Sequence, residues 1–219
     1  MPMTARLAAL LLALLMTLPA AARDAAPLVP GVDYVEIPDG QPFEDDGAIE
    51  VVEVFGYTCP HCAAFEPRLR AWKARLPADV RVTPVAAPFG GHWMPYARAY
   101  FAARTMGVAT RTHAAMFRAL HEERALPLGG ATASDISAFY AGQGVDAERF
   151  EAAMASDAVQ ADLQRADAFL RRAGVDGTPA LVVQGRYRVL GNSFQELLDN
   201  ADALVARERA ARARAGLAD

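Results

Sequence analysis

The residues of this chain best suited to chemistry are its only two cysteines, Cys59 and Cys62, in the segment VVEVFGYTCPHCAAFEP. Only Pro60 and His61 separate them. A disulfide that closes so short a loop constrains the unfolded chain little, so the pair would be a weak structural crosslink. The spacing instead indicates a reactive dithiol that exchanges disulfides with other thiols.

The two cysteines lie where a predicted strand ends and a predicted helix begins. Pro60 suits the first helical turn, where its missing N–H costs nothing, so Cys59 falls at or beside the N-cap. Free backbone N–H groups and the positive end of the helix dipole favour a thiolate there. The dipole supplies at most about 2 kcal/mol, so we expect His61 and backbone N–H groups to add to it. Cys62 would then be the more buried, resolving thiol.

A zinc site is an alternative for any C-x-x-C pair. The chain has no second such pair and no two histidines at the spacing of zinc ligands. The other histidines, His92, His113 and His121, are interpreted as structural or surface residues. The sequence therefore implies no metal and no organic cofactor, and a metal-delivery protein stays open as an alternative.

Residues 1–22 have the pattern of a secretory signal peptide. Arg6 precedes an apolar run, Leu7 to Leu18, which is followed by Pro19 and three small residues. The run is shorter than the roughly 20 residues that a helix needs to cross a bilayer. Cleavage after Ala22 is therefore favoured over an uncleaved membrane anchor, and the mature chain would enter a compartment where disulfides persist.

The composition is that of a globular protein, with 53% apolar and 22% charged residues and a net charge of −4. Nucleic-acid binders need a basic surface to neutralise phosphates, and this balance predicts none. We interpret the arginine-rich C-terminal segment as a solvated face of a terminal helix whose end frays. Its basic residues are Arg207, Arg209, Arg212 and Arg214.

Apolar patterning predicts strands toward both ends of the chain and helices between them. The predicted strands are Tyr34–Ile37, Ile49–Phe55, Val80–Val85, Ala180–Val183 and Tyr187–Leu190. Between the third and fourth strands, about 95–173, the periodicity is helical, with N-caps at Thr132, Asp146 and Ser156 and a stop at Gly174. Another helix follows from about Ser193. This order predicts one mixed α/β domain with a helical insertion.

Two segments resemble the DsbA-type thiol oxidases of the bacterial periplasm, within the thioredoxin superfamily. They are EVFGYTCPHCAAFEP and GVDGTPALVVQGRYRVLG. The resemblance implies a thioredoxin-like fold with a helical subdomain inserted between the third and fourth strands. The expected division is a removed signal peptide at 1–22, a thioredoxin-like domain from 23–93 and 174–219, and an inserted subdomain at 94–173.

The resemblance also implies roles for Thr178 and Pro179. Pro179 corresponds to the family's cis-proline, which faces the disulfide. The backbone of Thr178 would pair with an extended substrate as an added strand. Valine is common at this position in the best-known DsbA proteins, so threonine is a departure that affects the expected redox potential and partner choice. An ordinary turn before a strand is the alternative for this dipeptide.

Glu53 is an acid within a strand of apolar residues, where burial on both faces makes a carboxylate costly and raises its pKa. It matches the family's buried acid beneath the active site, which implies that it takes or returns the proton of Cys62. A glutamate at a surface edge is the alternative. The lysine that often accompanies this acid is missing from the third strand.

Residues near the start of the predicted insertion offer further candidates. The segment from Phe89 to Met94 could form a hydrophobic rim around Cys59, with Trp93 and Met94 contacting substrate or simply packing. Pro67 lies within the active-site helix and is expected to kink it.

The resemblance predicts a periplasmic oxidase that donates the Cys59–Cys62 disulfide to reduced exported proteins. A DsbB-type quinone-linked membrane oxidase is expected to reoxidise it. A disulfide isomerase or reductase of the same superfamily is the first alternative, and a peptide-binding chaperone is the second. The family's dimeric isomerases carry an N-terminal dimerisation domain, for which residues 23–58 are too few. We therefore expect a monomer.

Overall fold

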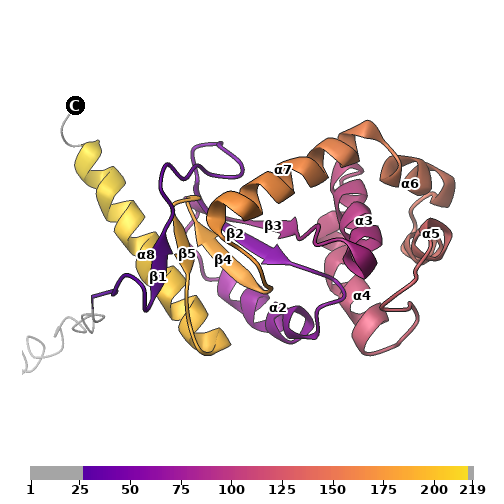
Figure 1. Ribbon diagram of the computed structural model, residues 1–219, viewed down its shortest axis with the longest axis horizontal. Helices are drawn as coiled ribbons and strands as arrows, with labels where there is room; N and C mark the ends of the chain where they lie inside the picture. Colours follow the sequence, from indigo (N-terminus) through magenta and orange to yellow (C-terminus); the bar gives the residue numbers. More distant parts are fainter. Residues whose placement is uncertain (1–26, 217–219) are drawn as a thin grey trace, which may run out of the picture.

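The structure, a computed structural model, describes residues 27–216, which form a five-stranded mixed sheet covered by helices (Figure 1). The strands are β1 (Tyr34–Glu36), β2 (Ile49–Phe55), β3 (Val80–Ala86), β4 (Ala180–Val183) and β5 (Tyr187–Val189). The helices are α2 (Pro60–Lys73), the 3-10 turn η2 (Gly91–Trp93), α3 (Met94–Thr105), α4 (Ala109–His121), α5 (Ala133–Gly142), α6 (Ala147–Met154), α7 (Asp157–Ala173) and α8 (Phe194–Ala215). The predicted signal peptide lies outside the described residues.

The sheet has the order β1-β5-β4-β2-β3. β2 pairs in parallel with β3 and antiparallel with β4, while β5 pairs antiparallel with both β4 and β1. All seven residues of β2 are buried, which explains why five of them are apolar; the other two are the acids Glu50 and Glu53. The active-site segment follows the end of this central strand. Among the described residues, no helix has the length and apolar character needed to cross a membrane.

Successive side chains of β2 point to opposite faces of the sheet and belong to two different hydrophobic clusters. Ile49 and Val51 pack with residues of α2 and α8, including Trp72. Val52 and Val54 pack with residues of the helices that follow β3. The sheet is therefore sandwiched between helices, and α2 is fixed to it by its own apolar side chains.

The five helices from α3 to α7 lie between β3 and β4 in the sequence, and most of them gather at one end of the molecule (Figure 1). The predicted N-caps are confirmed, because the side chains of Thr132, Asp146 and Ser156 each accept a backbone N–H three residues later. Gly174 ends α7 with a left-handed φ of 63°, as predicted. The predicted strands agree with the observed ones to within one residue at each end.

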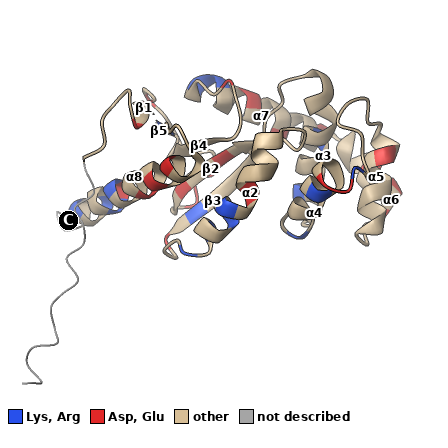
Figure 2. Ribbon diagram, turned by 90° about the horizontal axis from the view of Figure 1, so that it is seen from below, with Lys and Arg blue, Asp and Glu red and all other residues tan. Residues whose placement is uncertain are grey.

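The arginine-rich end of α8 has the predicted solvated face, since Arg207, Arg209, Arg212 and Arg214 are all exposed, but it differs from the predicted frayed end. α8 continues to Ala215, and Figure 2 shows acidic residues nearer its start and basic residues toward its C-terminus. Arg209 donates to Asp79 at 2.8 Å, and Arg212 donates to the carbonyls of Gly47 and Ala48. These contacts with the loops beside β2 hold the last turns against the core.

A second buried acid, which the sequence analysis did not identify, lies near the start of β2. Glu50 is fully buried. It accepts hydrogen bonds from the backbone N–H groups of Phe43 (2.6 Å) and Glu44 (3.1 Å) and from the hydroxyl of Thr83 (2.6 Å). Arg81 adds an ion pair at 3.3 Å. The carboxylate therefore fixes the loop before β2 onto β2 and β3.

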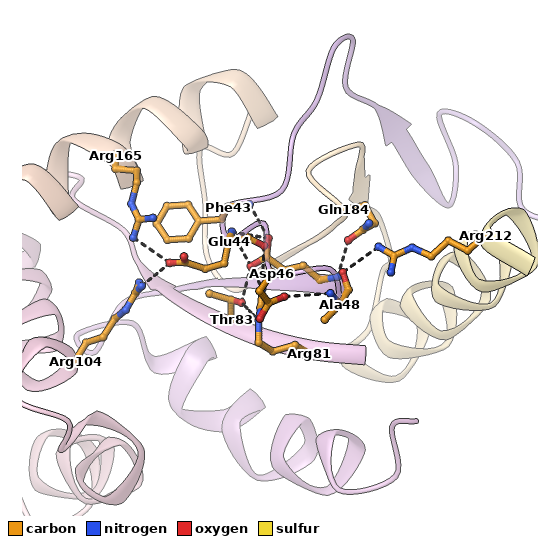
Figure 3. Close-up of polar contacts among 11 residues, drawn as sticks. Phe43, Glu44, Asp46, Ala48, Arg81, Thr83, Arg104, Arg165, Gln184 and Arg212 are labelled. Atoms are coloured by element: carbon orange, nitrogen blue, oxygen red, sulfur yellow. Dashed lines mark hydrogen bonds and ion pairs between the residues drawn. The ribbon is translucent and has the colours of Figure 1, made fainter. Parts of the chain in front are cut away.

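The same loop contacts the helical insertion through Glu44. Figure 3 shows Arg104 of α3 and Arg165 of α7 approaching the Glu44 carboxylate from different directions. The Arg165 guanidinium also lies over the Phe43 ring, 4.2 Å from its centre. Burial raises the pKa of Glu44, but the hydrogen bonds from the two arginines outweigh it and the pKa is lowered overall. This cluster joins the insertion to the core on the side away from the cysteines.

Replacing Glu50 should destabilise the fold without touching the cysteines. We expect Glu50→Ala to lower the free energy of unfolding by about 3 kcal/mol, because it leaves two backbone N–H groups and the Thr83 hydroxyl without a buried acceptor. Urea denaturation measures the change. The exposed Glu36→Ala variant is the control and should change the value by less than about 0.5 kcal/mol; equal values for the two variants would contradict the assignment.

Candidate active site

Cys59 is the N-cap of α2, with φ −83° and ψ 117°, and Pro60 is the first helical residue. Both positions agree with the prediction from the sequence. Cys59 keeps 6% of its surface exposed and Cys62 only 1%, so an incoming thiol reaches Cys59 first. Pro67 lies inside α2, which continues through it to Lys73.

The surroundings of Cys59 lower its pKa to about 5. The largest cause is a hydrogen bond from the Cys62 thiol, and burial opposes it. The Thr178 side chain and the backbone N–H groups of Cys62 and His61 lower the pKa further. His61 therefore acts through its backbone, and its exposed imidazole is not among the principal causes.

Cys62 has the opposite behaviour. Burial raises its pKa strongly, and its hydrogen bond to Cys59 raises it further. One thiol is thus held as a thiolate at neutral pH and the other is held protonated. Such a pair has a good leaving group at the accessible sulfur and a protonated thiol beneath it.

The segment before β4 lies directly against Cys59. The Thr178–Pro179 peptide bond is cis, as predicted. The Cys59 sulfur is 3.5 Å from the Thr178 carbonyl oxygen. The Thr178 hydroxyl is buried and has no partner of ordinary hydrogen-bond geometry among the described residues, which leaves it available to a thiolate. Residues that are about 120 positions apart in the chain are thereby brought together at one sulfur.

Glu53 is buried within β2, with 2% of its surface exposed, as the sequence predicts. It is in register with Leu181 of β4, which belongs to the cluster on the α2 side of the sheet. Burial raises the Glu53 pKa to about 7, the positive charge of Lys73 lowers it and the negative charge of Glu66 raises it. The cation near this acid therefore comes from the end of α2 and not from β3, a placement that the sequence analysis missed.

Trp93 lies over the backbone at the end of β2. A methyl group built on Gly56 would come within 1.9 Å of the Trp93 ring, so only glycine leaves room for it there. The Phe89 ring, 40% exposed, lies 5.4 Å from that of Trp93. Trp93 and Met94 are partly buried and pack against the larger hydrophobic cluster, which includes Cys59 and Cys62. Gly56 is a site-shaping residue that the sequence analysis did not identify.

An open groove of about 840 Å³ borders the site. His61 and the Thr178–Pro179 segment line it on one side, and the start of α8 around Phe194 lines it on another. The groove can hold an extended chain segment whose sulfur reaches Cys59. Within residues 27–216 there is no group of three or more His, Cys, Asp or Glu side chains arranged to hold a metal ion.

Both the sequence and the structure of this chain are similar to those of known proteins. The DSBA-like thioredoxin domain family matches residues 50–202. The chain is 39% identical over 184 residues to the thiol:disulfide interchange protein DsbA of Pseudomonas aeruginosa, covering 83% of this chain and 86% of that protein. It is also similar to the crystal structure of oxidoreductase DsbA from Xylella fastidiosa, with 51% sequence identity and a TM-score of 0.82. That match covers 85% of this chain and all of the other. The P. aeruginosa DsbA crystal structure, 38% identical, has a TM-score of 0.77 over 84% of this chain and 96% of that one.

The lowered pKa of Cys59 makes the stability of the reduced protein depend on pH. Because the pKa falls from 9.0 to about 5 on folding, the thiolate's contribution is complete above pH about 9 and is lost as pH falls through about 5. We expect the reduced form to gain stability relative to the oxidised form between pH 5 and 9, as measured by urea denaturation of both forms. A constant difference across this range would contradict the assigned thiolate.

The Thr178 hydroxyl should also contribute to the redox potential. We expect Thr178→Val to raise the Cys59 pKa and to shift the equilibrium with glutathione toward the oxidised protein by about threefold, the effect of one weak hydrogen bond. Thr132→Val removes a hydroxyl from the α5 N-cap and is the matched control, since it should lower stability and leave that equilibrium unchanged. Identical equilibrium constants for native protein and Thr178→Val would exclude a role for this hydroxyl.

Proposed function

Because the chain belongs to the DSBA-like thioredoxin domain family, we propose that it oxidises reduced exported proteins by donating the Cys59–Cys62 disulfide through a mixed disulfide on Cys59. It is a thiol:disulfide oxidoreductase, the activity for which its relatives are named. The observation that supports the direction of transfer is the separation of the two thiol pKa values. A site that stabilises the reduced thiolate makes the disulfide the stronger oxidant.

The reaction takes place in two exchanges of a sulfur–sulfur bond. A substrate thiolate attacks the Cys59 sulfur, the bond to Cys62 breaks, and the sulfur of Cys62 leaves and takes up a proton. A second substrate thiolate then attacks the substrate sulfur of the mixed disulfide, and Cys59 leaves as a thiolate. Two electrons pass from the two substrate thiols to the cysteine pair, and the substrate gains a disulfide. The lowered pKa of Cys59 favours the last step, because a more acidic thiol leaves faster.

Glu53 is proposed to exchange the proton of Cys62. It lies in β2 on the side of the sheet that α2 covers, and its pKa of about 7 lets it hold or release a proton near neutral pH. The leaving sulfur of Cys62 is buried and needs a proton that bulk water does not readily supply. A carboxyl group with a pKa near the working pH is well suited to that exchange.

The substrate is proposed to bind beside the Thr178–Pro179 segment. An extended chain would pair with the Thr178 backbone as an added strand and continue along the groove past His61. Trp93 and Met94 are proposed to form part of the apolar rim on the opposite side of the cysteines. No sequence-specific pocket is required, which suits an enzyme that acts on many reduced proteins.

The cellular setting is part of the same proposal. Residues 1–22 would direct export and be removed, and the mature protein would act in the periplasm as a monomer. A DsbB-type quinone-linked membrane oxidase would restore the disulfide after each cycle. Residues 23–93 and 174–219 would form the thioredoxin-like domain, and 94–173 the inserted subdomain.

Variants of the two cysteines test the order of the exchanges. We expect Cys59→Ser to abolish disulfide transfer to a reduced, unfolded protein substrate, because no accessible sulfur remains. When a mixed disulfide is formed on Cys59, the Cys62→Ser variant should release the bound partner at least tenfold more slowly than the native protein, in the absence of further thiols. Mass spectrometry of the trapped species identifies the bonded cysteine. Mixed disulfides found on Cys62 in the Cys59→Ser protein, formed at the native rate, would contradict the assignment.

Glu53 is tested by the pH dependence of the reverse step, in which Cys62 attacks a mixed disulfide between Cys59 and glutathione. We expect this rate to rise with pH through about 7 in the native protein, because the ionised Glu53 accepts the Cys62 proton. Glu53→Gln should slow the step by roughly 10-fold to 100-fold at pH 8 and remove that inflection. Glu36→Gln, at an exposed position of the edge strand β1, is the control and should keep it. An unchanged pH profile in Glu53→Gln would exclude the proton exchange.

A further inference from the structure

We propose that His121 of α4 is a positioning residue for the redox site, which holds the turn from Gly56 to Cys59 through a hydrogen bond to the backbone of Tyr57. The His121 Nε2 atom lies 2.7 Å from the Tyr57 carbonyl oxygen. His121 is the last residue of α4, which lies in the segment between β3 and β4, and Tyr57 is the second residue after the end of β2. The helical insertion thus supplies a contact to the backbone two residues before Cys59.

The direction of this hydrogen bond follows from its chemistry. A backbone carbonyl only accepts hydrogen bonds, so the Nε2 atom of His121 must carry the hydrogen. The bond therefore requires an N–H donor at this position and does not depend on charge. An amide side chain of similar reach could replace the ring, whereas an apolar side chain of the same length could not.

The segment that His121 contacts is a tight turn. The N–H of Cys59 donates to the carbonyl of Gly56 at 3.0 Å, so Tyr57 and Thr58 are the two central residues of the turn. The Thr58 hydroxyl is buried and has no partner among the described residues. The Thr58 hydroxyl therefore adds no hydrogen bond to the turn, whereas the Tyr57 carbonyl accepts one from His121.

The ring of Tyr57 is held by α4 as well. Its hydroxyl lies 2.9 Å from Nδ1 of His113, and its ring is 1% exposed and packs edge-on against Phe55 and Phe117. Burial lowers the pKa of His113 to about 3, so that imidazole is neutral and the contact is an uncharged hydrogen bond. Two histidines of one helix thus hold the side chain and the carbonyl of the same residue.

The consequence for the active site comes from geometry. The backbone N–H groups of His61 and Cys62 lower the Cys59 pKa only if the turn presents the sulfur to them. The same turn sets how closely the Cys59 sulfur approaches the Thr178 side chain, which also lowers the Cys59 pKa. Hydrogen bonds weaken steeply with misalignment, so a loosened turn stabilises the thiolate less. Loss of the His121 bond should therefore weaken the reduced form relative to the disulfide.

The test compares His121→Gln with His121→Met in the full-length mature protein. The two side chains have similar length, and only glutamine carries an N–H donor. We expect His121→Met to shift the equilibrium with glutathione toward the oxidised protein by about threefold to tenfold, the range for one hydrogen bond. The pH midpoint for alkylation of Cys59 by iodoacetamide should rise in parallel. His121→Gln should stay within about twofold of the native values.

A control separates positioning from general loss of stability. Ser156→Ala removes the N-cap hydrogen bond of α7, which the Ser156 hydroxyl accepts from the backbone N–H of Val159. It should lower the melting temperature and leave both the equilibrium and the alkylation midpoint unchanged. His121→Phe serves the same comparison if the Met variant does not fold. Native values for both readouts in the donor-free variant, or an equal shift in His121→Gln, would overturn the proposal.

This inference depends on the proposed function only in that the cysteine pair is redox-active. If the native protein proved to be a reductant, the oxidase assignment would fail. The alkylation midpoint would still report the Cys59 thiolate in each variant. The measured redox direction thus tests the oxidase assignment, and the alkylation midpoints of the variants test the role of His121.

Discussion

The structure depends on a single electrostatic arrangement, the stabilisation of a negative sulfur at Cys59. The start of α2 supplies backbone N–H groups, the Cys62 thiol donates the hydrogen bond that lowers the Cys59 pKa most, and the Thr178 side chain approaches from the segment before β4. The first two groups come from residues next to Cys59 in the chain, whereas Thr178 is 119 residues away and reaches the sulfur only through the fold. The central strand β2, buried on both faces, is what brings the start of α2 and the start of β4 to the same place.

The helical insertion has a direct part in this arrangement. It contacts the core at two distant places, through Glu44 on one side and through Tyr57 on the other. The first contact is ionic and fixes a loop before β2, whereas the second is a neutral hydrogen bond beside the cysteines. A change in how the insertion packs would therefore reach the redox pair through the contact between α4 and Tyr57.

Much of this could be predicted from local patterns. Cys59 at the N-cap follows from Pro60, the burial of Glu53 from its apolar neighbours in β2, and three insertion N-caps from residue type alone. The cis bond before Pro179 came from family resemblance and not from the residues themselves. By contrast, Glu50, Lys73 and His121 gain their roles from partners on other elements, 33 residues away for Glu50 and Thr83 and 64 for His121 and Tyr57. Periodicity and spacing report only on neighbours in sequence, so such contacts become visible only once the strands and helices are assembled.

The central claim is that the fold stabilises the reduced pair and so makes its disulfide a donor. The most direct measurement is the equilibrium of the native Cys59–Cys62 pair with a glutathione redox buffer at neutral pH. A stabilised Cys59 thiolate predicts a reduction potential well above that of the glutathione couple. Most of the protein would then be reduced in a buffer that contains equal concentrations of reduced and oxidised glutathione. A potential near that of thioredoxin, about −270 mV, would mean that the thiolate is not stabilised and would contradict the account.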